Sequence, residues 1–115
     1  MTRARIAGVG MTPFGRHEER TIRDLFAAAA REAIADAGVP HADVDEVAFG
    51  NFMGEFAEGQ GHSGPLAAEA AGVRAPSARI ESACASSGAA VRQGLNRIRA
   101  GEADVVLVGG AERMT

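Results

Sequence analysis

The sequence predicts a layered α/β fold in which a mostly parallel sheet is flanked by helices. Three observations predict it. Short apolar runs alternate with longer segments whose apolar residues recur at helical spacing, an order typical of α/β domains. Residues 105–108 are continuously apolar, like strands that are covered on both faces of a parallel sheet. The chain has 115 residues, and since single domains most often contain about 100 to 150 residues, it has room for one core.

The first two predicted elements are a strand and a long helix. Residues 6–11 are apolar or glycine and end at a turn that contains Pro and Gly, so we expect a buried strand there. Thr21 and Asp24 have the spacing of a capping box. Apolar residues then recur at helical spacing up to Gly38, which has the position of a C-terminal cap. We therefore expect a helix between Thr21 and Gly38.

The middle of the chain predicts two more strands separated by a loop and a short helix. Residues 46–49 read as a strand, and the five glycines in 50–64 predict a long loop inside the domain. We expect a short helix over residues 65–71 that starts with proline in its first turn and ends at a glycine. We expect a third short strand over residues 78–81.

A second long helix is predicted over residues 84–100, with Gly101 as its cap. Its apolar or small face consists of Cys84, Gly88, Val91, Leu95 and Ile98. The first two turns contain no charge, whereas arginines gather near the carboxyl end, where cations offset the helix dipole. We therefore expect the front half to be buried and the back half to face water.

The run 105–108 is the last predicted strand, and the chain ends a few residues after it. A central strand at this position would leave backbone hydrogen-bonding groups bare, so we expect the chain to be truncated or part of a larger molecule. The alternative is a compact four-stranded domain whose end is frayed.

Composition excludes several classes of function. The net charge is −3, which gives no electrostatic footprint for a nucleic-acid backbone, and the five Phe residues are too scattered to form a stacking platform for bases. All twelve cationic residues are Arg, so a P-loop lysine and a Schiff-base lysine are both excluded. We expect no nucleic acid among the partners.

The single cysteine and the N-terminus indicate a protein of the cytoplasm. One cysteine forms neither an internal disulfide nor a CxxC metal site, and the three histidines do not form HExxH, so we expect no metal. The apolar stretch near the N-terminus is too short for a signal peptide or a membrane span. We therefore expect a soluble, cytoplasmic protein that does not associate with membranes.

Three polar or glycine-rich features allow a functional and a plain structural interpretation. The sequence of residues 8–10 resembles part of a dinucleotide-binding fingerprint, but Pro13 stands where the third glycine is required, so a strand-to-turn interpretation is favoured. His62 has no second metal-ligating or catalytic residue at suitable spacing and is interpreted as a surface residue. Glu55 and Glu58 have the spacing of an acid–base pair, yet in a glycine-rich loop they are better explained as solvated charges.

Cys84 is the strongest candidate for a catalytic residue. It lies at the junction between the strand 78–81 and the helix 84–100, and the residues that follow it are small. A helix N-terminus has unpaired N–H groups and a positive dipole end, which favour a thiolate over a thiol and stabilise an oxyanion. The alternative is that Cys84 is a small buried hydrophobic residue, as lone cysteines commonly are.

The segment 81–88 resembles the nucleophile segment of thiolases, in particular the ACASG-like core of archaeal acetyl-CoA acetyltransferases and sterol-carrier-protein-type thiolases. Residues 8–15, 50–54 and 106–114 resemble further thiolase segments in the same order and spacing. One departure is Ser87, where many members have glycine followed by serine.

The resemblance implies that residues 1–115 are an incomplete thiolase N-terminal domain, from the first half of a fold with two similar halves. The implied activity is that of an acetyl-CoA C-acetyltransferase of lipid metabolism. Cys84 would attack an acyl-CoA thioester, hold the acyl group and pass it to CoA in thiolysis or to an acetyl-CoA carbanion in Claisen condensation. Coenzyme A thioesters are substrates in this scheme, and no cofactor is needed. The family's activating histidine and second acid–base group correspond to positions beyond Thr115, so 115 residues alone would be inactive.

The resemblance also implies partners. Thiolases pair through this half, so we expect a homo-oligomer that binds acyl-CoA and CoA. A hydroxymethylglutaryl-CoA synthase and a small zinc-bearing OB-fold protein are further expected partners. The alternatives are a fragment of a ketoacyl synthase or hydroxymethylglutaryl-CoA synthase, or a non-catalytic thiolase-like partner subunit.

Overall fold

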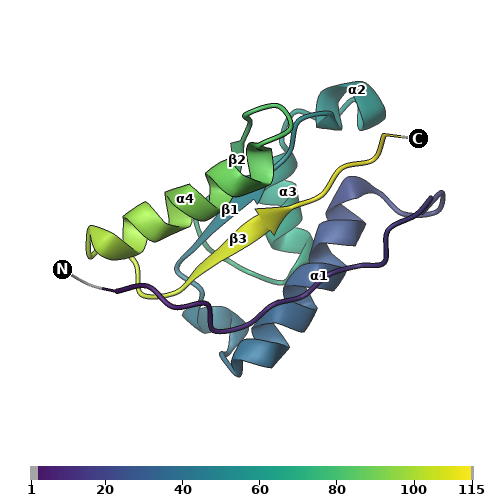
Figure 1. Cartoon of the computed structure of the whole chain (residues 1–115). Helices are drawn as coiled ribbons and strands as arrows, with labels where there is room; N and C mark the ends of the chain where they lie inside the picture. Colours follow the sequence, from purple (N-terminus) through teal and green to yellow (C-terminus); the bar gives the residue numbers. More distant parts are fainter. Residues whose placement is uncertain (1–2, 115) are drawn as a thin grey trace.

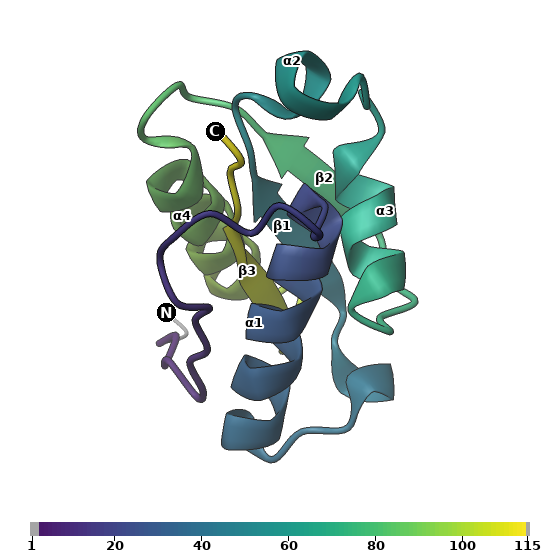
Figure 2. The same cartoon turned by 90° about the vertical axis from the view of Figure 1, so that its right-hand side faces the viewer.

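The computed structural model describes residues 3–114 and has the predicted layered α/β architecture, with a parallel sheet flanked by helices. Its elements, in order, are α1 (Ile22–Ala37), the 3-10 helix η1 (His41–Asp43), β1 (Glu46–Gly50), α2 (Gly54–Glu58), α3 (Ser63–Ala70), β2 (Ser77–Ile80), α4 (Ser86–Arg99) and β3 (Val106–Gly110). Helix α4 covers one face of the sheet, and α1 and α3 cover the other (Figures 1 and 2).

The sheet is fully parallel, with the strand order β2-β1-β3. Gly50, the last residue of β1, lies opposite Ile80 of β2 and Gly110 of β3. The carboxyl ends of all three strands therefore lie together at one end of the sheet, which is where ligands bind in open α/β sheets. We call this end of the sheet the carboxyl end and the opposite end, where the strands begin, the amino end.

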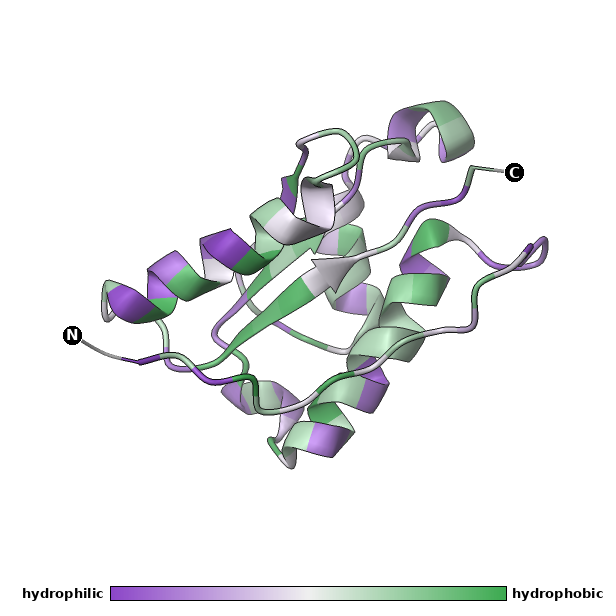
Figure 3. Cartoon of the chain, viewed as in Figure 1, coloured by the Kyte–Doolittle hydropathy of each residue, from purple (hydrophilic) through white to green (hydrophobic). Residues whose placement is uncertain are grey.

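The hydrophobic core fills the space between the sheet and the helices α1 and α3. Its buried members are Ile22, Phe26, Ala30, Ile34, Val44, Val47, Phe49, Ala67, Ala68, Ala71, Val73 and Leu107. The rings of Phe26 and Phe49 meet edge to face, with centroids 4.8 Å apart. Hydrophobic colour runs along the strands, whereas α4 alternates between hydrophobic and hydrophilic residues (Figure 3).

Helix α1 has both of the caps that the sequence predicts. The Thr21 hydroxyl accepts the N–H of Asp24 at 3.2 Å, and the Asp24 carboxylate accepts the N–H of Thr21 at 2.9 Å. The hydrogen bond from the Thr21 N–H holds the pKa of Asp24 below its ordinary value. Gly38 ends the helix with φ = +69°, a conformation that glycine adopts without strain.

The predicted strand at residues 6–11 is wrong. This segment has no strand partner and runs alongside α1 (Figures 1 and 2), with Ile6 86% exposed. Its two glycines permit this path: a Cβ at Gly8 would lie 2.6 Å from the N of Ala37, and one at Gly10 would lie 2.7 Å from the N of Ala33. The glycines therefore serve close packing against a helix, and Val9 between them is exposed.

The stretch 50–64 is not only a loop, because it contains the short helix α2. Asn51 stabilises the turn before this helix, since its Oδ1 atom accepts the N–H of Gly54, the first helical residue, at 3.0 Å. Gly59 ends it with φ = +63°. The glycines of this stretch predicted a loop, but two of them, Gly54 and Gly59, begin and end a short helix.

Helix α4 begins two residues later than predicted, and its buried face is a different one. Ser86, Ala90 and Gly94 are buried, whereas Val91 of the predicted apolar face is 51% exposed. A Cβ at Gly94 would collide with the side chain of Val108. The smallest residues therefore face the sheet, and the expectation of a buried front half is wrong.

Strand β3 lies at an edge of the sheet formed by the described residues, with β1 in the centre. Leu107 is buried, but Val106 and Val108 are half-buried. Helix α4 packs on one face of this strand and α1 on the other, so the apolar run is covered on both faces, as expected.

Within residues 3–114, no helix combines the length and the apolar character that crossing a membrane requires.

Candidate active site

Cys84 lies at the carboxyl end, in the connection between β2 and α4. It is exposed and has a free thiol. The structure therefore does not support the alternative of a small buried hydrophobic residue. The thiol is one residue before Ala85, the N-cap of α4, and so outside the helix rather than in its first turn.

The connection around Cys84 is held in consecutive tight turns. The Ser82 carbonyl accepts the N–H of Ala85 at 2.9 Å, and the Ala83 carbonyl accepts the N–H of Ser86 at 3.2 Å. Ala83 has φ = +49°, the left-handed conformation in which a Cβ is strained by about 1 to 2 kcal/mol. Strain of this kind persists where the surroundings over-determine the backbone, often at functional sites.

Ser86 is the side chain that fixes these turns. Its Oγ accepts the N–H of Ser82 at 2.8 Å and donates to the carbonyl of Ala83 at 2.7 Å. Ser86 is 3% exposed. Sequence reasoning missed its role, although serine side chains often bond to backbone groups three or four residues earlier.

Glycines bring the start of α4 close to the strand ends. A Cβ at Gly50 would lie 2.7 Å from the carbonyl oxygen of Ser86 and 2.7 Å from both the N and the Cα of Ser87. A Cβ at Gly110 would collide with the carbonyl oxygen of Gly50. Only residues without a side chain fit here, so the backbone of the Cys84 segment sits directly on the sheet.

A buried polar network joins the three strand ends. Asn51 is fully buried, and its Nδ2 donates to the carbonyl of Ala111 at 2.9 Å and to Glu112 at 3.0 Å. The Glu112 carboxylate also accepts the N–H groups of Phe52 and Met53. Because a satisfied buried network fixes one arrangement, these contacts hold the loops after β1 and β3 together.

Arg79 connects β2 to the same network. Its Nε donates to the carbonyl of Asn51 at 3.1 Å, and its guanidinium also donates to the carbonyl of Phe52 at 3.1 Å. Asn51 and Glu112 lie within the segments 50–54 and 106–114 whose motifs resemble thiolases. The structure brings these two segments into contact with each other at the carboxyl end, where the Cys84 connection also lies.

The weaker candidates lie elsewhere. His62 is exposed, and its Nδ1 lies 3.3 Å from Gln60, in agreement with the surface interpretation. Glu58 is not a solvated charge, because it accepts the N–H of Ile22 at 2.8 Å and pairs with Arg113 at 3.4 Å. Within the described part of the chain, no three His, Cys, Asp or Glu side chains gather as metal ligands would.

Residues 4–115 match the family description "Thiolase, N-terminal domain". The chain is 44% identical over 111 residues to an acetyl-CoA acetyltransferase of Methanocaldococcus jannaschii, covering 96% of this chain and 28% of the relative. It is 31% identical over 121 residues to human sterol carrier protein 2, covering 100% of this chain and 21% of that protein. The chain thus spans less than a third of the length of these relatives.

Solved structures have the same fold. An acetyl-CoA acetyltransferase from Syntrophomonas wolfei matches with a TM-score of 0.78 and 25% identity, over 88% of this chain and 26% of that one. A thiolase from Ascaris suum, solved in complex with coenzyme A, matches with a TM-score of 0.83 and 22% identity, over 91% of this chain and 28% of that one.

Proposed function

Because the chain belongs to the thiolase family, we propose that it is the nucleophile-bearing part of an acetyl-CoA C-acetyltransferase, with Cys84 as the nucleophile. One observation carries the proposal: the thiol is exposed on a turn that Ser86 and two glycines fix, in the segment that resembles the thiolase nucleophile segment. The name of the archaeal relatives supports the acetyl-CoA substrate. The chain covers 28% of the first relative, so the activity belongs to the longer molecule of which such a domain is part.

In the first half-reaction, the Cys84 thiolate attacks the thioester carbonyl of an acyl-CoA. The C–S bond to CoA breaks, CoA leaves as a thiolate that takes up a proton, and the acyl group stays on Cys84 as a new thioester. In the second, either a CoA thiolate or the enolate of acetyl-CoA attacks that thioester and frees the cysteine. The first alternative is thiolysis and the second is Claisen condensation.

The backbone N–H of Cys84 is the oxyanion donor that this chain contributes. Within residues 3–114 it has no hydrogen-bond acceptor, unlike the N–H groups of Ala83, Ala85 and Ser86. A free N–H beside the nucleophile stabilises the negative oxygen of the tetrahedral intermediate. The base that deprotonates the thiol would come from residues beyond Thr115, as the family resemblance implies.

Assembly and location follow from the same proposal. We expect a cytoplasmic homo-oligomer that pairs through this domain, acts in lipid metabolism and uses CoA thioesters without a cofactor. A hydroxymethylglutaryl-CoA synthase and a zinc-bearing OB-fold protein remain expected partners. Size-exclusion chromatography with light scattering, followed by mass spectrometry of co-purifying proteins, tests both expectations.

The test is an activity assay on the protein isolated from its native cells, after its intact mass has been measured. We expect acetoacetyl-CoA thiolysis, and Cys84→Ala should lower the rate at least about a thousandfold, as losing a covalent nucleophile does. Activity with acyl carrier protein substrates in place of CoA thioesters would instead indicate a ketoacyl synthase. Binding to a full-length thiolase without any turnover would indicate a non-catalytic partner subunit.

A further inference from the structure

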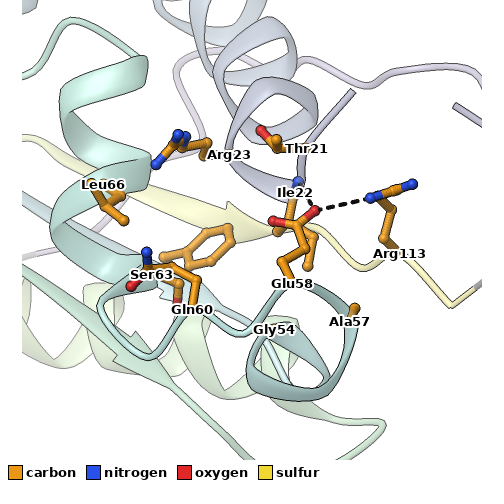
Figure 4. Close-up of a pocket in the computed structure, with 11 residues that line it drawn as sticks. Thr21, Ile22, Arg23, Gly54, Ala57, Glu58, Gln60, Ser63, Leu66 and Arg113 are labelled. Carbon is orange, nitrogen blue, oxygen red and sulfur yellow. Dashed lines mark hydrogen bonds and ion pairs between the residues drawn. The ribbon is translucent and has the colours of Figure 1, made fainter. Parts of the chain in front are cut away.

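Glu81 is the first residue after β2 and lies three residues before Cys84. It is exposed, and its carboxylate accepts the backbone N–H of Ala83 at 2.6 Å. Within the described part of the chain it forms no ion pair. Glu58 differs, because its carboxylate pairs with Arg113 (Figure 4). The contact that Glu81 makes is therefore with the turn that carries the thiol.

The left-handed conformation of Ala83, with φ = +49°, depends on the two peptide groups that flank it. In the group before it, the Ser82 carbonyl accepts the N–H of Ala85, and the Ala83 N–H donates to Glu81. In the group after it, the Ala83 carbonyl accepts both the N–H and the hydroxyl of Ser86. Because a residue with a Cβ disfavours this φ, it is kept only while both peptide groups are held.

The peptide group after Ala83 also contains the N–H of Cys84. In a trans peptide group the carbonyl and the N–H point in opposite directions. Since the Ala83 carbonyl points toward Ser86 at the start of α4, the Cys84 N–H points away from that contact. A relaxation of Ala83 to an ordinary negative φ would turn this N–H in another direction.

We propose that Glu81 is a positioning residue that keeps the Cys84 N–H aimed at the oxygen of the reacting acyl group. This inference rests on the proposed function. When the Cys84 sulfur bonds to the thioester carbon, the carbonyl oxygen takes the electron pair of the C=O bond, and the double bond re-forms as CoA leaves as a thiolate. The N–H stabilises the charge on that oxygen. Glu81 touches no reacting atom and acts through Ala83, so an uncharged acceptor at position 81 would serve the same purpose.

The test compares two reactions of Cys84 in the whole protein, both followed by mass spectrometry of the peptide 80–92. Acetylation by acetyl-CoA passes through an oxyanion, whereas alkylation by iodoacetamide displaces iodide from a CH₂ carbon and forms none. Glu81→Ala should lower the acetylation rate at saturating acetyl-CoA about tenfold, the effect of losing one charge-assisted hydrogen bond. The half-saturating acetyl-CoA concentration and the alkylation rate should change by less than about twofold, because the thiol itself is unaltered.

Three further variants separate positioning from a general loss of structure. Glu81→Gln retains an oxygen that accepts the N–H and should keep at least about a third of the acetylation rate. Ala83→Gly removes the strain, so in that background Glu81→Ala should slow acetylation less than about threefold. Glu69→Ala, at an exposed glutamate of α3 on the other face of the sheet from α4, is the matched control and should change neither reaction.

Four outcomes would overturn the inference alone. These are equal acetylation of the unmodified and Glu81→Ala proteins, equal slowing of acetylation and alkylation, a Glu81→Gln protein as slow as Glu81→Ala, and a full tenfold loss in the Ala83→Gly background. A failure of the unmodified protein to become acetylated on Cys84 is a different result. It would overturn the proposed function and this inference with it.

Discussion

The two ends of the sheet are held together by different means. At the carboxyl end, glycines bring backbone atoms into direct contact, and the fully buried Asn51 joins the loops after β1 and β3. At the amino end, Arg97 contacts Glu46 at 2.7 Å and Glu102 at 2.6 Å. There Asp45 also accepts two N–H groups of the segment before β3.

This difference indicates which end of the sheet tolerates substitutions. Long charged side chains in contact with water adapt their geometry, and exposed ion pairs contribute little stability. Backbone atoms in contact and a buried amide with all its partners have no such freedom, because any added atom or lost partner must be accommodated inside a close-packed region. The candidate nucleophile lies at the end that cannot adapt, so its surroundings are organised before any substrate binds.

The largest expected effect comes from adding one methyl group at the carboxyl end. Gly50→Ala would place a Cβ 2.7 Å from three backbone atoms of Ser86 and Ser87, which cannot move without displacing α4. We expect unfolding free energy to fall by about 3 kcal/mol, measured by urea denaturation.

Gly88→Ala is the matched control for this change. It lies in α4, and a Cβ there meets no heavy atom within 4 Å. Alanine should stabilise the helix by up to about 1 kcal/mol. Equal effects of the two substitutions would contradict the close approach of α4 to the strand ends.

The second largest effect is expected at the buried amide. Asn51→Ala would leave the N–H of Gly54 and the carbonyl of Ala111 without their partner. Each unsatisfied buried group costs about 1 to 3 kcal/mol, so we expect a loss of about 2 kcal/mol by urea denaturation. Asn96→Ala on the exposed face of α4 is the control and should change stability by less than about 0.5 kcal/mol.

Ser86→Ala should have a somewhat smaller effect. It removes two hydrogen bonds, but the cavity that it leaves is small. The N–H of Ser82 loses its acceptor, and we expect a loss of about 1.5 kcal/mol. Ser87→Ala, the neighbouring exposed serine, is the comparison. If both serines gave the same small effect, the hydroxyl of Ser86 would not be what fixes the turns beside Cys84.

The hydrogen bonds to Asp45 at the amino end should make the free energy of unfolding depend on pH. The backbone N–H groups of Asp104 and Val105 hold the pKa of Asp45 below its ordinary value of 3.8. A lowered folded-state pKa stabilises the protein above the unfolded-state value, and this stabilisation is lost as the pH falls through the folded-state pKa.

Urea midpoints measured between pH 5 and pH 2.5 test this prediction. Stability should fall less steeply in Asp45→Asn than in the unmodified chain. Asp43→Asn, at an exposed aspartate of η1, should keep the full slope. Parallel pH profiles for all three proteins would show that Asp45 does not hold the amino end.

The smallest effect is expected for the ion pairs. The hydrogen bond that Arg97 donates to Glu46, with a further contribution from the charge of Glu102, raises the pKa of Arg97. Arg97→Gln should lower Tm by no more than about 3 °C, and the difference should vanish in 1 M NaCl. A difference that persists at high salt would indicate that Arg97 acts through packing instead.

Local sequence signals predicted a helix correctly where its first and last residues have recognisable capping patterns. The capping box at Thr21 and the glycine at Gly38 predict α1 to the residue. They were not enough where a glycine serves a distant contact. Gly8 and Gly10 read as part of a strand, but they lie against α1, and Gly94 looks neutral in the sequence but faces Val108.

The candidate site was predictable in part. Cys84 stands out as a lone thiol between a strand and a helix, and the neighbouring sequence resembles a known nucleophile segment. The contact between Asn51 and Glu112 joins residues 61 positions apart, so no local pattern in one sequence indicates it. Likewise, the turns fixed by Ser86 depend on a backbone conformation at Ala83 that side chains with a Cβ rarely adopt.

The most direct test of the central claim is a mass measurement of the acyl-enzyme. Cleavage after Arg79 and Arg92 releases a peptide, residues 80–92, that contains Cys84 and no other cysteine. After a brief reaction of the native protein with acetyl-CoA, this peptide should carry one acetyl group that hydroxylamine removes, as it removes thioesters. Cys84→Ala should carry none. An unmodified peptide 80–92 in a protein that performs thiolysis, or an acetyl group on the Cys84→Ala peptide, would contradict the assignment of Cys84 as the nucleophile.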